Sequence, residues 1–150
     1  MRPSAAIGLA LALTTAAVPI PAVGAAPRAP AADANLFVYR IHTDFGWAAN
    51  LKVDGATLAS LGNGAYTATR LAPGEHTLTL GWPMMSGFRS IDTPLTVEPG
   101  KTYYFEIRGL DPRFMTGLMV GARIAASLAP AEESAAPGTI AQCCAFQPPK

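Results

Sequence analysis

The chain has 150 residues, which is enough for one domain. Charged residues make up 14% of it and the formal net charge is +1, so no basic or acidic surplus indicates a nucleic acid or an acidic partner. The 14 glycines and 14 prolines favour a turn-rich fold.

The N-terminal segment has the pattern of a secretory signal peptide. Arg2 precedes an apolar stretch over residues 5–17, two prolines follow, and small residues up to Ala25 offer a cleavage position. A membrane anchor needs about 20 apolar residues, and the prolines come too early for that. We therefore predict that residues 1–25 are removed on export, that no transmembrane span remains, and that the product is periplasmic or extracellular, in solution or associated with the cell envelope.

The rest of the chain is organised as short strands between turns. Residues 26–34 form a Pro/Ala-rich spacer that has little to bury, so we expect it to be flexible or extended. Seven later stretches have strand-like alternation or are rich in aromatic and β-branched residues. These stretches are residues 36–41, 50–53, 57–61, 65–71, 76–80, 90–97 and 101–110. The dipeptides Asp54-Gly55, Pro73-Gly74 and Pro99-Gly100 are turn signals.

This spacing predicts an all-β fold, an antiparallel β-sandwich of about seven strands over residues 35–124. Leu78 and Tyr104 are expected in its core, and Pro94 indicates that the strand at 90–97 begins late or lies on an edge. The Ala/Pro-rich residues 125–150 are expected to be an irregular tail.

Two elements are proposed close to this tail. Residues 116–121 fit one more strand between glycines, and residues 122–136 fit a short helix that Pro137 and Gly138 would stop.

Several motifs resemble a known family. They are the hairpin Val53-Asp54-Gly55-Ala56-Thr57-Leu58-Ala59-Ser60-Leu61-Gly62-Asn63-Gly64-Ala65-Tyr66, the strand start Pro73-Gly74-Glu75-His76-Thr77-Leu78, and the stretch Pro99-Gly100-Lys101-Thr102-Tyr103-Tyr104. Over about residues 35–109 the chain resembles a bacterial secreted domain of unknown function, number 2846, and also the PEGA-type and transthyretin-like β domains. The resemblance implies an envelope-associated β domain without established catalytic residues. Many relatives are lipoproteins, and this chain lacks their lipidation cysteine.

No residue pattern indicates catalysis, a cofactor or a metal. His42, Asp44 and His76 are too few for a metal site, which needs three or four converging ligands. The chain has no Gly-x-Ser-x-Gly elbow, no phosphate loop and no dinucleotide fingerprint. We therefore interpret the two histidines as packed or hydrogen-bonded side chains.

Large apolar residues gather in the two longest connections of the expected sheets. They are Trp47, Trp82, Met84, Met85 and Phe88. Exposed together they would form a partner-binding patch, because aromatic and Met side chains are favoured at contact surfaces. The alternative is that they cap one end of the core, because large apolar residues tend to be buried.

Cys143 and Cys144 are adjacent. Neighbouring cysteines pair only through an eight-membered ring, and ordinary disulfides have a larger Cα separation than consecutive residues. We therefore interpret them as tail thiols or as a disulfide to another chain.

These observations favour a non-catalytic envelope module that binds a protein or a glycan. A small hydrolase with an unrecognised cleft and a purely structural spacer are the alternatives.

Overall fold

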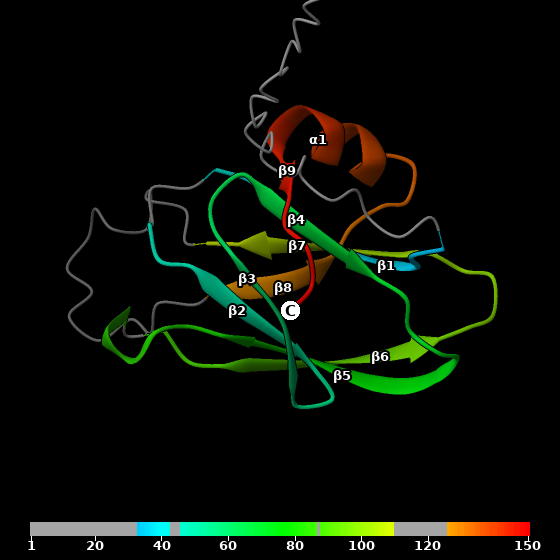
Figure 1. Cartoon of the computed structure of the whole chain (residues 1–150), viewed down its shortest axis with the longest axis horizontal. Coiled ribbons are helices and arrows are strands. Elements are labelled where there is room, and N and C mark those ends of the chain that lie inside the picture. The colour runs from blue at the N-terminus through cyan, green and yellow to red at the C-terminus, as the bar shows by residue number, and fades with distance from the viewer. Residues whose placement is uncertain (1–32, 43–45, 87, 110–125) are drawn as a thin grey trace, which may run out of the picture.

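The computed structural model describes residues 33–42, 46–86, 88–109 and 126–150. The predicted signal peptide, nearly all of the expected spacer and the expected strand at 116–121 lie outside these residues. In the described part, nine strands form two sheets, and one α-helix covers the outer face of the larger sheet (Figure 1).

The larger sheet has the strand order β8-β7-β1-β4-β9. Its strands are β1 (Leu36–Arg40), β4 (Ala65–Thr69), β7 (Tyr103–Arg108), β8 (Ser127–Pro130) and β9 (Ala145–Phe146). The smaller sheet has the order β3-β2-β5-β6. Its strands are β2 (Ala49–Val53), β3 (Ala56–Leu61), β5 (Gly74–Gly81) and β6 (Ile91–Val97).

The first seven strands lie where the sequence predicts them, so the all-β class is confirmed. Most neighbouring strands pair antiparallel, as expected, but β1 pairs in parallel with β7 and β4 pairs in parallel with β9. Strand β4 runs opposite to β1, and β5 and β6 of the smaller sheet then carry the chain back, so it enters β7 from the end at which β1 began. Pro94 lies on β6, which is an edge strand as predicted.

The turn between β2 and β3 follows the local sequence signal. Asp54 has a φ of 50° and Gly55 a φ of 81°, and a two-residue hairpin with both φ values positive matches the right-handed twist of the strands. Asp is one of the few residues other than Gly that tolerates this conformation.

The core lies between the two sheets and is almost entirely aliphatic. Its largest fully buried side chains include Leu36, Leu51, Leu61, Leu78, Leu80 and Ile107. Leu78 is 0% exposed, as predicted from the alternation along β5.

Tyr104 does not belong to this core, which corrects its predicted position. The core residues of β7 are Phe105 and Ile107, so the intervening Tyr104 faces the other side of the sheet and is half-buried. There it packs with residues of helix α1 (Ala136–Cys143). Strand β7 carries aromatic residues on both faces because both faces are covered.

The C-terminal segment is ordered, so the expectation of an irregular tail is wrong for residues 126–150. Strand β8 pairs with β7, and β9 pairs with β4. Helix α1 occupies residues 136–143 rather than ending at Pro137. Proline is tolerated in the first turn of a helix because the N–H groups there have no partner within the helix.

Candidate functional site

Two long connections, one from β1 to β2 and the other from β5 to β6, both contact Arg40. Arg40 is 1% exposed, and its Nη1 donates to the carbonyl oxygens of Trp47 and Leu61. Its guanidinium carbon lies 5.1 Å from the centre of the Trp82 ring, a cation–π distance. Burial lowers the pKa of Arg40. One buried cation therefore holds both tryptophan-bearing loops.

The five residues predicted as a patch divide into a supporting pair and an exposed set. Trp82 and Phe88 are half-buried, with ring centres 4.9 Å apart, and Trp82 packs on the core. Met84 is 98% exposed, Met85 is 89% exposed and Trp47 is 44% exposed. The two methionines belong to the 3-10 turn η1 (Met84–Ser86), which presents them to solvent. We call Trp47, Met84 and Met85 the loop-end patch.

The histidines considered as ligands are not brought together. His76 begins the buried row of β5, whereas His42 is exposed, and Asp44 lies outside the described residues. Within the described ranges, no group of three or more His, Cys, Asp or Glu side chains is placed to hold a metal ion.

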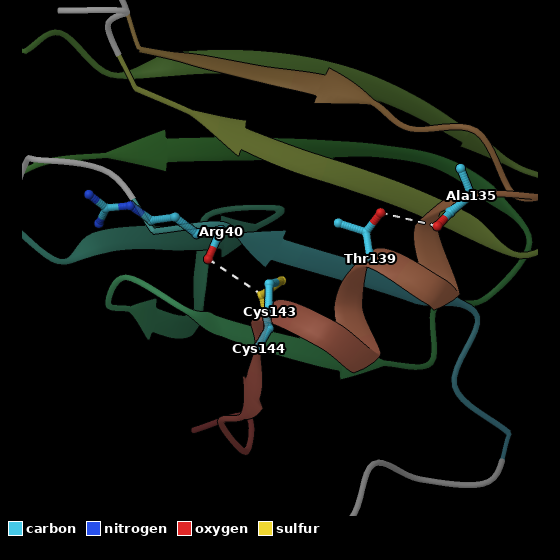
Figure 2. Close-up of a disulfide and its surroundings, with 5 residues drawn as sticks. All are labelled: Arg40, Ala135, Thr139, Cys143 and Cys144. Atoms are coloured by element: carbon cyan, nitrogen blue, oxygen red, sulfur yellow. Dashed lines mark hydrogen bonds between the residues drawn. A yellow bond between two sulfur atoms is a disulfide. The ribbon is translucent and has the colours of Figure 1, made fainter.

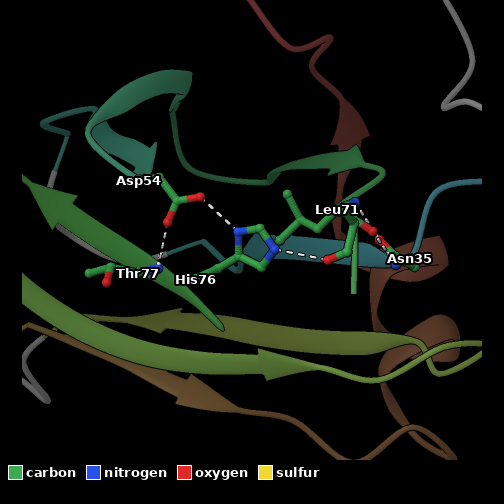
Figure 3. A network of polar contacts seen from close by, with 6 residues as sticks. Asn35, Asp54, Leu71, His76 and Thr77 are labelled. Carbon is green, nitrogen blue, oxygen red and sulfur yellow. Dashed lines mark hydrogen bonds and ion pairs between the residues drawn. The ribbon is translucent and has the colours of Figure 1, made fainter. Parts of the chain in front are cut away.

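His76 instead joins two turns of the chain (Figure 3). Its Nδ1 lies 2.7 Å from Oδ2 of Asp54, and its Nε2 lies 2.9 Å from the carbonyl oxygen of Ala72. The other oxygen of Asp54 accepts the backbone N–H of Thr77 at 2.8 Å. Carboxylate and carbonyl oxygens only accept, so the imidazolium is the form that satisfies both contacts of the ring.

The electrostatics of this pair agree with that geometry. The hydrogen bond with Asp54 raises the pKa of His76 above 6.5, and the same bond lowers the pKa of Asp54 below 3.8. The His76–Asp54 pair joins the β2–β3 turn to β5. His76 is therefore a hydrogen-bonded side chain, as interpreted from the sequence.

A groove lies between helix α1 and the larger sheet. It has a volume of about 400 Å³ and is lined by Phe37, Tyr66, Tyr104, Pro137, Ile140, Ala141 and Cys144. Phe37 and Tyr104 stack with ring centres 5.1 Å apart. Burial raises the pKa of Tyr104, and the negative charge of Glu133 adds to the effect. The surface is mostly apolar, with two tyrosine hydroxyls as polar groups.

The two cysteines form a disulfide with each other at the end of α1 (Figure 2). This corrects the interpretation as free tail thiols or a bond to another chain. The eight-membered ring fits here because the backbone changes at this point from helix to extended, with Cys144 at a φ of −134° and a ψ of 133°. Cys144 also lines the groove under the helix.

The groove was not found from the sequence, although a signal for it exists. The runs Leu36-Phe37-Val38-Tyr39 and Tyr103-Tyr104-Phe105 are apolar or aromatic on both faces. A strand that is covered on one face alone alternates with polar residues, so such runs indicate a covered outer face.

The comparisons with known proteins give one match. A family described as protein of unknown function, DUF2846, matches residues 30–118. No curated protein and no solved structure is significantly similar to the chain. The structure has, in its described part, no helix with the length and apolar character that crossing a membrane requires.

Proposed function

Since the chain belongs to the DUF2846 family of proteins of unknown function, we propose its function from its structure: a non-catalytic binding module of the cell envelope that docks a partner protein at the loop-end patch. The proposal includes export after removal of residues 1–25, on the evidence of the signal-peptide pattern. It also includes a sandwich related to the PEGA-type domains, on the evidence of the turn-and-strand motifs.

The exposure of the loop-end patch is the observation that carries the proposal. Among the described residues, Trp47, Met84 and Met85 are the large hydrophobic side chains that are exposed, and Arg40 contacts both of their loops. Trp and Met are enriched where proteins contact each other, and Met adapts its shape to a partner. Arg40 contacts the carbonyl oxygen of Trp47 and the ring of Trp82, so the backbones of these two loops need less ordering when a partner binds.

A protein is favoured over a glycan as the partner. Glycan sites use exposed aromatic faces together with polar groups, and Trp47 is the one aromatic member of this patch. Two flexible thioether side chains that extend into solvent fit an apolar pocket on a protein surface better.

The hydrolase alternative has less support than binding. It would draw on His42 and His76, yet His76 is engaged by Asp54 and Ala72, and His42 is exposed on a different segment. A purely structural spacer would have no use for exposed methionines.

The experiment compares three forms of the exported chain in capture from envelope extract. They are the wild type, the Met84→Asp/Met85→Asp variant, and the Thr96→Asp control, which adds a charge at an exposed position on β6. The proposal expects a protein that the wild type and the control retain and that the methionine variant loses. The same proteins on all three forms, or a bound glycan in place of a protein, would contradict it.

A further inference from the structure

The disulfide lies at the junction between helix α1 and the last residues of the chain. Cys144 caps the helix: its N–H donates the last helical hydrogen bond, to the carbonyl oxygen of Ile140 at 3.0 Å. The chain then continues as an extended segment. We call residues 145–150 the C-terminal strap.

The strap is held by backbone hydrogen bonds to both sheets. Ala145 N–H donates to Gly64 at 2.9 Å, and Gln147 N–H donates to Tyr66 at 2.7 Å, both beside β4 in the larger sheet. Lys150 N–H donates to Leu58 of β3, in the smaller sheet, at 2.9 Å. The strap therefore crosses from the edge of one sheet to the edge of the other.

The helix end fits closely against the turn that precedes β4. A Cβ atom added to Gly64 would lie 3.2 Å from the carbonyl oxygen of Cys143, which is tighter than an ordinary contact, and Gly64 has a φ of +65°, so glycine suits this close approach. The peptide bond between Cys143 and Cys144 is part of the disulfide ring. The ring thereby limits the direction in which the chain leaves α1 and enters the strap.

We propose that the Cys143–Cys144 disulfide is a thiol-exchange site for a dithiol reductant, and that its opening releases the C-terminal strap from β4 and β3. Both cysteines are half-buried, and Cys144 lines the groove between α1 and the larger sheet, which gives a thiolate a route to the bond. Access is one of the conditions that decide the rate of thiol–disulfide exchange.

The reaction is balanced by the dithiol. One thiolate of the reductant attacks one sulfur of the pair, the S–S bond breaks, and the departing thiolate takes a proton from water. The second thiol of the reductant loses its proton and attacks the reductant's own sulfur in the mixed disulfide, and the remaining cysteine leaves as a thiolate that takes up a proton. The protein gains two thiols, and the reductant leaves as a disulfide.

The structure accommodates the reduced form. The Sγ atom of Cys144 lies 3.6 Å from the carbonyl oxygen of Arg40 (Figure 2). A disulfide sulfur carries no hydrogen, whereas the thiol of reduced Cys144 has one to donate to this oxygen. The reduced side chain thus has a partner ready, which favours opening of the ring.

Release of the strap changes the accessible surface. It frees the edge of β4, where Ala65 and Tyr66 pair with β9. It also moves the Phe146 ring away from the Tyr66 ring, whose centre lies 5.3 Å from its own. Tyr66 and Cys144 both line the groove under α1. The redox state of the pair would thereby control access to a sheet edge and to this groove.

Hydrogen exchange of the full chain, with and without dithiothreitol, tests the proposal. After reduction, confirmed by alkylation of two cysteines, the amides of Ala145, Gln147 and Lys150 should exchange at least about tenfold faster, the factor that about 1.4 kcal/mol of lost local stability produces. The amide of Tyr103 serves as the internal control, because it donates to Asn35 at 2.8 Å in a part of the sheet that the strap does not contact.

A Cys143→Ala/Cys144→Ser variant gives a second measurement. It should exchange at the strap as fast as the reduced wild type, with or without dithiothreitol, and reoxidation of the wild type should restore slow exchange. A disulfide that millimolar dithiothreitol leaves intact would overturn the proposal. So would strap amides that exchange equally slowly in the oxidised and reduced forms.

Discussion

Replacing Leu78 with alanine tests the arrangement of the two sheets. Leu78 is 0% exposed and lies on β5, which has β2 on one side and β6 on the other. It pairs with Val53 on the first and with Thr93 on the second. Strands on both sides hold the backbone in place, so the surroundings have little freedom to close the cavity that the substitution leaves.

The expected loss of stability follows from that position. Leu→Ala substitutions in such cores cost about 2–5 kcal/mol, a large share of the roughly 5–15 kcal/mol that stabilises a domain. A loss of about 3 kcal/mol, divided by a typical urea m-value of about 2 kcal/mol per molar, lowers the unfolding midpoint by about 1.5 M. Urea denaturation followed by tryptophan fluorescence measures this shift.

Thr77→Ala provides the matched control. Its side chain is exposed on the opposite face of the same strand, and its backbone N–H keeps the hydrogen bond to Asp54. The control should change the free energy of unfolding by no more than about 0.5 kcal/mol. If Leu78→Ala unfolds at the wild-type midpoint, or if the two variants lose equal stability, the assigned face of β5 is wrong.

Three further predictions concern other parts of the chain. The pKa of His76 is raised in the folded protein, so the stability that its contact with Asp54 contributes is complete below about pH 6.5 and is lost as the pH rises through the folded pKa. The urea midpoint of the wild type should therefore fall toward alkaline pH relative to that of His76→Gln. Parallel pH profiles of the two proteins would exclude a stabilising role of the His76–Asp54 pair. Gly64→Ala should cost about 1 kcal/mol or more, because Gly64 has a φ of +65° and closely approaches the Cys143 carbonyl, whereas a Cβ at Gly62 has nothing within 4 Å and Gly62→Ala should be milder; equal midpoints would refute this. Mass spectrometry of the exported chain should find an N-terminus between Ala25 and Ala32, and an intact Met1 would refute cleavage.

The first seven strands were predictable because their signals are local. The alternation of His76, Leu78 and Leu80 defines the buried face of β5, and the Asp54-Gly55 dipeptide forms the expected turn. The parallel pairing of β1 with β7 was not predictable in the same way, because it depends on contacts between segments far apart in the sequence. Local periodicity identifies a strand without identifying its neighbour.

The C-terminal part shows the same limit in another form. Proline breaks a helix at most positions, but Pro137 lies in the first turn of α1, where proline is tolerated. The adjacent cysteines are paired because the chain turns from helix to strand between them, a change that spacing alone does not reveal. The sequence placed the candidate patch residues in loops but did not show which of them are exposed. The structure shows that Met84 and Met85 are exposed and that Trp82 is half-buried.

Titration of the captured partner protein tests the central claim most directly. It should be measured against the wild type, Met84→Asp/Met85→Asp and His76→Ala, each first shown to be folded. The binding-module account predicts that the methionine variant loses affinity by more than about tenfold, as expected when anchor residues worth about 2 kcal/mol are lost, while His76→Ala binds as the wild type does. Loss of binding in His76→Ala together with wild-type affinity in the methionine variant would contradict the account.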